Sequence, residues 1–206
     1  DNPFANVYSS STSLSDIDGD GDNDLIITGL LEVDNRISKL YKNDGTGIFS
    51  EVLNTPFVPV DKADVAFAVV DGDGDDDLFI SGQKIGQAGL GLDAFAMLYL
   101  NDGLGNFTEG PYSPIAGAID GSADFADVDG DGDEDILLTG KPHFVGPGST
   151  NLYLNDGSGI FHEEVNTPSI DVSNSSVAYS DIDQDDDFDL IISGGFSYTK
   201  LYWNNG

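Results

Sequence analysis

The sequence contains no cysteine and few basic residues, and both absences exclude classes of protein. Without cysteine, the 206-residue chain uses no disulfide and has no thiol nucleophile. Seven Lys and Arg residues stand against 38 Asp and Glu residues, which gives a formal net charge of −31. Nucleic acids and anionic membrane surfaces bind proteins through Lys and Arg, so we expect no nucleic-acid partner. No apolar run approaches the roughly 18 residues of a membrane span, so we expect no direct membrane insertion.

An aspartate-rich loop is the most prominent pattern that is present. In its first copy, residues 16–24 read Asp-Ile-Asp-Gly-Asp-Gly-Asp-Asn-Asp, and an apolar run follows at once. Five carboxylates this close repel one another at neutral pH, so a folded chain keeps them together if a cation neutralises them. Hard oxygen ligands in a flexible loop suit Ca²⁺ best. A single loop of this kind could equally be a solvated acidic turn, but this loop returns three times in one register.

The loop belongs to a repeat of the whole chain. The third position of each copy is occupied by Asp18, Asp71, Asp129 and Asp183, so the spacings are 53, 58 and 54 residues. After each loop come a short apolar run that ends in Gly, then Leu-Tyr-x-Asn, and then an Asp-Gly or Asn-Gly pair. We therefore treat residues 1–206 as one segment with repeats at approximately 3–55, 56–113, 114–167 and 168–206.

Each repeat is expected to form four β-strands. An alternating segment precedes the Asp loop, the apolar run follows it, Leu-Tyr-x-Asn forms the third strand, and a tight Asn-Asp-Gly turn leads into the fourth. Residues 85–98 could pass for a helix, but Gly86, Gly89 and Gly91 argue against one. The last repeat stops at residues 204–206, so we expect it to lack its fourth strand.

Four-stranded units of about 55 residues predict an all-β chain, folded as a β-propeller of four-stranded antiparallel blades. One unit cannot bury its apolar faces alone, so neighbouring units must stack. Four blades lie at the bottom of the usual range, and we therefore expect the four repeats to be part of a larger propeller or array. More blades of the parent chain or a second copy would complete it. Strand alternation places the Asp loops and the Asn-Asp-Gly turns on one face, and the loops between strands two and three on the other.

The Asp loops are the candidate metal sites. Counted from Asp16 as position 1, carboxylates fall at positions 1, 3, 5, 7 and 9, and Gly21 at position 6 allows a sharp turn. An EF-hand needs a bidentate Glu at position 12, but Ile27 stands there, so we reject an EF-hand. We predict up to four Ca²⁺ ions, one per loop. The candidate ligands are Asp16, Asp18, Asp20, Asp22 and Asp24 of loop one, Asp71, Asp73, Asp75 and Asp77 of loop two, Asp127, Asp129, Asp131, Asp133 and Asp135 of loop three, and Asp181, Asp183, Asp185, Asp187 and Asp189 of loop four.

Two loops depart from this pattern. Loop two has Val69 at position 1, and the loss of one charged ligand makes it the weakest predicted site. Loop four has Asp186 in place of Gly at position 6. If that position needs a positive φ, a residue other than Gly costs about 1 kcal/mol there.

The nine-residue loop, set in four-stranded units of this length, resembles the FG-GAP/VCBS repeat family. Relatives include the calcium loops of integrin α-subunit propellers and repeats in secreted and surface proteins of bacteria. The resemblance covers essentially all 206 residues and rests on the loop and on Leu-Tyr-x-Asn-x-Gly. It implies structural calcium, an extracellular or cell-surface location, and a protein or glycan ligand on a cell or matrix surface.

The sequence offers little for catalysis, so we expect the chain not to be an enzyme. Close carboxylates also form glycosidase pairs, but here the same carboxylates recur in every unit at metal spacing. His143 and His162, the two histidines, neither repeat nor belong to a metal or triad pattern, and we expect both at the surface. The aligned tyrosines of Leu-Tyr-x-Asn could stack on sugars, although packing between blades is the favoured interpretation.

Two functions are compatible with these observations. The first is a calcium-stabilised extracellular β-propeller that serves as a non-catalytic adhesion or ligand-binding scaffold. The second is an accessory or lectin-like domain of a secreted carbohydrate-active enzyme. The loop between strands two and three carries the length variation. Its longest copy, residues 83–96, mixes one Lys with several apolar residues: Lys84, Ile85, Leu90, Leu92 and Phe95. This loop either packs over its own blade or forms, together with residues 141–150, the contact surface for the ligand.

Overall fold

The computed structural model describes residues 3–86, 91–111, 113–165, 167, 170, 172–195 and 197–205. The described residues form β-strands and no helix. This confirms the all-β prediction. It also settles the ambiguous segment 85–98: one strand ends at Ile85 and the next begins at Leu92, and none of the described residues is helical. Leu90 lies outside the described residues.

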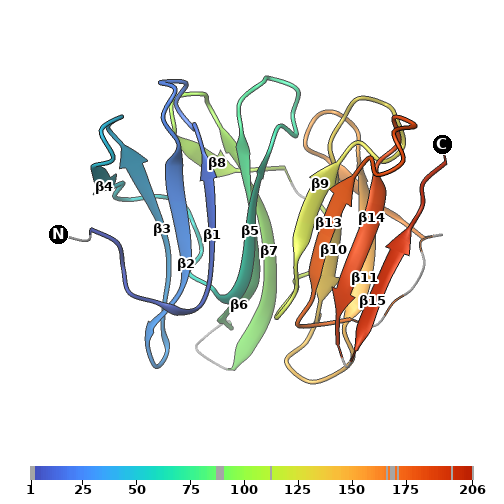
Figure 1. Cartoon of the computed structure of the whole chain (residues 1–206). Helices are drawn as coiled ribbons and strands as arrows, with labels where there is room; N and C mark the ends of the chain where they lie inside the picture. The colour runs from blue at the N-terminus through green and yellow to red at the C-terminus, as the bar shows by residue number, and fades with distance from the viewer. Residues whose placement is uncertain are drawn as a thin grey trace.

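The strands follow one another in four antiparallel sheets (Figure 1). Each sheet runs in chain order, so every strand pairs with its neighbour in sequence. The first sheet holds β1 (Tyr8–Ser15), β2 (Asp24–Glu32), β3 (Asn35–Asn43) and β4 (Phe49–Glu51); the second holds β5 (Asp61–Ala68), β6 (Asp77–Ile85), β7 (Leu92–Asn101) and β8 (Phe107–Glu109); the third holds β9 (Ala123–Ala126), β10 (Asp135–Gly140), β11 (Ser149–Asn155) and β12 (Phe161–Glu164); and the fourth holds β13 (Ser176–Ser180), β14 (Asp189–Gly194) and β15 (Tyr198–Tyr202).

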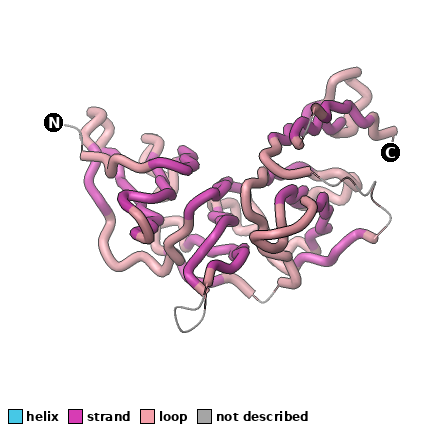
Figure 2. The backbone as a smooth tube through the Cα atoms, turned by 90° about the horizontal axis from the view of Figure 1, so that it is seen from below, coloured by secondary structure: helices cyan, strands magenta, loops and turns pink. Residues whose placement is uncertain are grey.

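These sheets are the blades of a β-propeller, as predicted. The first strand of each sheet lies beside the first strand of the next, so β1, β5, β9 and β13 line the inner side. Figure 2 shows the blades along an arc, with the first blade at one end and the fourth at the other. Within the described residues the fourth blade has three strands.

The hydrophobic core lies between successive blades rather than inside one of them. Ile26 and Leu40 of the first blade pack against Leu78 and Tyr99 of the second, and these four side chains are almost completely buried. The other face of the second blade packs on the third blade in the same way, and the third packs on the fourth. Stacking is therefore what buries the apolar faces that a single blade would expose.

The Gly that ends the apolar run of each repeat has a packing reason. Gly29 has a φ of 144°, and a Cβ there would come within 3.0 Å of the Tyr8 carbonyl oxygen and the Ser10 Cβ of the neighbouring strand. The register between β1 and β2 shifts at that point, because Ser9 takes a φ of 50° and bulges toward β2. A register shift also occurs between β5 and β6 beside Lys62, whose φ is 47°, and Asp120 and Asn174 have similar φ values of 52° and 49° at the equivalent repeat position.

The tyrosine of Leu-Tyr-x-Asn packs in the core, which confirms the packing interpretation for three repeats. Tyr41, Tyr99 and Tyr153 are at most 1% exposed. The hydroxyl of Tyr99 accepts a hydrogen bond of 3.0 Å from the Val58 amide, and those of Tyr41 and Tyr153 accept equivalent bonds from the links before their own blades. His143 and His162 are both exposed, as expected.

Candidate metal centres

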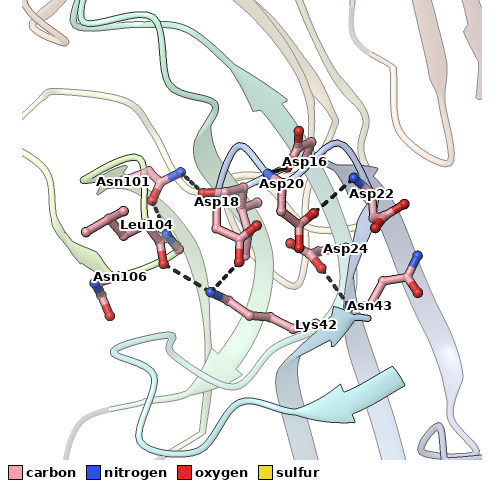
Figure 3. A network of polar contacts seen from close by, with 12 residues as sticks. Asp16, Asp18, Asp20, Asp22, Asp24, Lys42, Asn43, Asn101, Leu104 and Asn106 are labelled. Atoms are coloured by element: carbon pink, nitrogen blue, oxygen red, sulfur yellow. Dashed lines mark hydrogen bonds and ion pairs between the residues drawn. The ribbon is translucent and has the colours of Figure 1, made fainter. Parts of the chain in front are cut away.

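Loop one folds around its own carboxylates (Figure 3). Asp16, at position 1, accepts backbone hydrogen bonds from the Asp20 amide at 3.1 Å and from the Gly21 amide at 2.9 Å. Asp20, at position 5, accepts one from the Asp22 amide at 3.0 Å. The chain therefore curls back on itself, and it brings the carboxylates of positions 1, 3 and 5 together.

Loops three and four repeat this geometry. Asp127 accepts amide hydrogen bonds of 2.8, 3.0 and 3.0 Å from positions 4, 5 and 6 of its loop. Asp181 accepts equivalent bonds of 2.7, 3.2 and 3.3 Å. Loop two has Val69 at this place, which offers no acceptor, and its Asp71 accepts an amide hydrogen bond from Asp73 instead. The missing carboxylate of loop two thus removes the group around which the other three loops fold.

The residue at position 6 of each Asp loop has a positive φ, which is the case in which a residue other than Gly is costly. The φ value is 91° at Gly21, 94° at Gly74 and 99° at Gly132. Asp186 takes the same conformation in loop four, with a φ of 73°. A side chain is strained in this region, so loop four folds at a cost that the other loops avoid.

The last aspartate of each loop is buried where β2, β6, β10 and β14 begin. Asp24, Asp77, Asp135 and Asp189 are at most 1% exposed. One carboxylate oxygen of each accepts a hydrogen bond of 2.7 to 3.0 Å from the backbone amide of the Asn in Leu-Tyr-x-Asn. Position 9 therefore ties the Asp loop to the end of the third strand.

Burial and neighbouring carboxylates both disfavour the ionised aspartates. Burial raises the pKa of Asp77 and that of Asp135 to about 6, although backbone hydrogen bonds from Asn101 and Asn155 oppose the shift. Burial also raises the pKa of Asp24, and the carboxylates of Asp18 and Asp20 add to it. Groups held in this way favour a bound cation, because the cation stabilises the ionised form.

The carboxylates converge closely enough for one ion in three of the loops. In each of the groups Asp16–Asp18–Asp20, Asp127–Asp129–Asp135 and Asp181–Asp183–Asp189, one carboxylate oxygen per residue lies within 4.8 Å of the others. Ca²⁺ binds oxygen at about 2.3–2.6 Å, so ligands on opposite sides of the ion are about 5 Å apart. Within the described residues, loop two brings no three carboxylates this close.

The Asp loop and the turn after the third strand lie on one face, as predicted. The Asp22 carboxylate of position 7 occupies the space that a Cβ on Gly45 would need, and Asp75 and Asp133 lie in the same way over Gly103 and Gly157. Gly is favoured at this place in the turn for two reasons: its φ is 70–77° in these three blades, and a Cβ would force the Asp side chain to move.

Two features at these sites escaped the sequence interpretation. Asn101 donates from Nδ2 to the Ile17 carbonyl at 2.8 Å and Asn155 donates to the Val70 carbonyl at 2.8 Å, so each Asn reaches the loop of the preceding blade. The recurrence of Asn beside each loop was the available signal. In addition, the Lys42 ammonium lies 2.8 Å from Asp18 Oδ2 (Figure 3). The sequence indicates this contact only through a Lys at the x position of Leu-Tyr-x-Asn, where the other repeats have Leu or Trp.

Comparison with protein families agrees with this geometry. The family model of the FG-GAP-like repeat matches residues 16–80 and 70–138, which begin at loop one and extend through loop three. No curated protein gives a significant match. The matched segments cover more than half of the sequence and contain three of the four Asp loops. The chain belongs to the FG-GAP-like repeat family.

Proposed function

We propose that this chain is a calcium-stabilised extracellular β-propeller that acts as a non-catalytic scaffold for adhesion or ligand binding. The observation that carries the proposal is the convergence of three carboxylates within 4.8 Å in loops one, three and four. Within the described residues, the buried Oδ1 of Asp18 has no hydrogen-bond partner. Buried carboxylate oxygens are expensive to leave unpaired, and a cation in the loop would satisfy them.

The residues present fit Ca²⁺ better than a transition metal. All candidate ligands are oxygens, and the loops contain neither Cys nor His. The carboxylates of positions 1, 3, 5 and 9 would hold the ion, and position 7 would add its backbone carbonyl. The ion would remove the repulsion among these carboxylates and so stabilise the folded loop. FG-GAP β-propellers are typically non-catalytic, in keeping with a structural ion.

The extracellular location is supported by chemistry and by the family. Repeats of the FG-GAP type commonly bind calcium and typically occur outside the cell. Extracellular modules bind Ca²⁺ at about 10⁻⁴–10⁻³ M, an affinity that a loop with a strained turn or a missing ligand could still reach. The part of the chain that the structure describes contains no helix able to span a bilayer.

We place the ligand-binding surface on the loops opposite the Asp loops. Lys84 and Leu92 of the second blade and Phe144 of the third line a hollow of about 460 Å³. Phe144 is 58% exposed and the neighbouring Val145 is 82% exposed, which is unusual for apolar side chains on so acidic a surface. Phe95 does not belong to this surface, because it is buried and the Lys84 ammonium lies 4.5 Å from its ring centre. A protein or glycan ligand with an apolar face fits these groups.

Calcium dependence is tested by thermal and urea unfolding with and without Ca²⁺. At a free Ca²⁺ concentration ten times Kd, each occupied loop should add about 1.4 kcal/mol to the free energy of unfolding. Excess EDTA should therefore lower Tm by several degrees. The double variant Asp18→Ala/Asp129→Ala should lose most of the Ca²⁺ response, whereas Glu51→Ala/Glu163→Ala, with the same change in charge away from the loops, should keep it. A Tm that Ca²⁺ leaves unchanged in the wild type would refute the proposal.

The ligand surface is tested separately. Leu92→Ser/Phe144→Ser should abolish binding of the labelled protein to a printed glycan array or to immobilised matrix proteins, without loss of stability. Ile48→Ser/Leu53→Ser is the matched control, because it removes two exposed apolar side chains of the first blade. Equal binding by both variants would place the ligand elsewhere.

A further inference from the structure

The side chain of Lys42 enters loop one from the third strand of the same blade. Its Nζ lies 2.8 Å from Asp18 Oδ2 and donates to the Leu104 carbonyl oxygen at 3.0 Å (Figure 3). Leu104 belongs to the turn between β7 and β8 of the second blade. One ammonium thus joins a candidate calcium ligand of the first blade to the backbone of the next blade.

The other blades have no cation at this position. The residues equivalent to Lys42 are Leu100, Leu154 and Trp203. The second blade offers a direct comparison. Lys42 of the first blade lies against Gly105 of the second. In the same way, Leu100 of the second blade lies against Gly159 of the third, with a methyl group 3.7 Å from where a Cβ on Gly159 would be. In loop two, a methyl group therefore takes the place that the ammonium occupies in loop one.

We propose that Lys42 is a built-in competitor of Ca²⁺ at loop one, so that loop one binds Ca²⁺ more weakly than loop three. This inference rests on the proposed function of the Asp loops. A Ca²⁺ ion on Asp18 and the ammonium on the same carboxylate repel each other. Ion binding must therefore displace Lys42 from Asp18 or bear that repulsion.

The two oxygens of Asp18 have different surroundings, so Lys42 leaves one of them available to an ion. Asp18 Oδ2 holds the ammonium, whereas Oδ1 is buried and has no hydrogen-bond partner among the described residues. The Lys42 side chain is 33% exposed, so it can turn toward solvent and relieve part of the repulsion. Screening by water and salt limits the effect further, and we expect a loss of Ca²⁺ affinity on the order of tenfold.

The same contact couples the ion to the junction of two blades. Lys42 reaches Leu104 from the position in which it also holds Asp18. When Ca²⁺ displaces the ammonium, this link between the first and second blades changes, while Asn101 still connects the second blade to Ile17. Loop one therefore senses Ca²⁺ over a higher concentration range than loop three, at a blade junction.

The test is a site-resolved Ca²⁺ titration by NMR. The backbone amides of Gly21 and Gly132, at position 6 of loops one and three, report on the two sites separately. Lys42→Leu places the side chain of the second blade at this position and should tighten binding at Gly21 about tenfold, with Gly132 unchanged. Lys39→Leu is the control, because it removes the same charge from the same strand, but Lys39 pairs with Glu51 at 2.9 Å.

A reciprocal variant guards against a trivial effect of Lys42→Leu on folding. Leu154→Lys brings an ammonium to the equivalent place beside loop three and should weaken binding at Gly132 by a similar factor. The inference is overturned if Lys42→Leu leaves the affinity at Gly21 unchanged, or if Lys39→Leu has the same effect. If no loop glycine responds to Ca²⁺ in any variant, the proposed calcium function fails and the inference with it. If Gly132 responds but Lys42→Leu does not change the affinity at Gly21, the inference alone fails.

Discussion

The hydrogen bond from Asn101 to the preceding blade should make a large contribution to stability. Asn101 is 5% exposed. Its Nδ2 donates to the Ile17 carbonyl at 2.8 Å and to the Asp76 carbonyl at 3.2 Å, and its Oδ1 accepts from the Gly105 amide at 3.1 Å. Asn101→Ala removes all three hydrogen bonds and leaves their partners without the side chain that pairs with them.

The expected loss can be estimated bond by bond. A hydrogen bond in a folded protein contributes about 1 kcal/mol, and an unpaired buried partner adds to the cost of losing it. We therefore expect Asn101→Ala to lower the free energy of unfolding by about 3 kcal/mol. For a protein of this size, that corresponds to roughly 6–12 °C in Tm.

Asn43 provides the matched control, because it holds the same place in Leu-Tyr-x-Asn of the first blade. Its side chain is half-buried, and its described partners all belong to its own blade: the Asn23 carbonyl at 3.3 Å and the amides of Gly45 and Gly47 at 3.2 Å. The bonds are longer and closer to solvent, so Asn43→Ala should cost about 1 kcal/mol. The difference of about 2 kcal/mol between the two variants combines the bond to the preceding blade with the deeper burial of Asn101.

Urea unfolding of the wild type and both variants, at one fixed Ca²⁺ concentration, gives these free energies. Equal losses for Asn101→Ala and Asn43→Ala would refute the reasoning. That result would mean that the bond to Ile17 adds nothing beyond what the blade supplies for itself.

Three further predictions concern single side chains. Val69→Asp restores position 1 of loop two and should tighten Ca²⁺ binding there several-fold, measured at the Gly74 amide; an unchanged affinity would contradict the role given to position 1. Asp186→Gly relieves the φ of 73° and should raise the free energy of unfolding in urea by about 1 kcal/mol, so a loss of stability would show that the side chain is needed. Burial raises the pKa of Asp64 above 3.8, so its contribution to stability is lost as pH rises through the pKa of the folded state. Asp64→Asn, which can keep the hydrogen bonds with Ser11 and the Ala123 amide, should therefore gain stability over the wild type as pH rises above 3.8, and a gain independent of pH would argue against this assignment.

The sequence alone determined the blades and the candidate sites within them. The Asp loop, the apolar run and Leu-Tyr-x-Asn are local patterns, and a strand or a tight turn depends mainly on residues close in sequence. For the same reason, the strain at Asp186 could be anticipated from the glycines that stand at position 6 elsewhere. The missing acceptor of loop two was likewise visible at Val69, before any contact was known.

The contacts between blades were decided by the tertiary structure. Asn101 and Ile17 are 84 residues apart, and Lys42 and Leu104 are 62 apart, so each contact joins residues of different repeats, and the sequence does not show which residue each side chain reaches. Whether a strand-three side chain meets the next blade, the preceding blade or solvent depends on how the sheets pack side by side. That packing makes the Asn that recurs in each repeat a link between blades, and it brings one Lys beside a candidate calcium ligand. Long-range packing of this kind is set by the shape of whole faces, which local residue patterns do not specify.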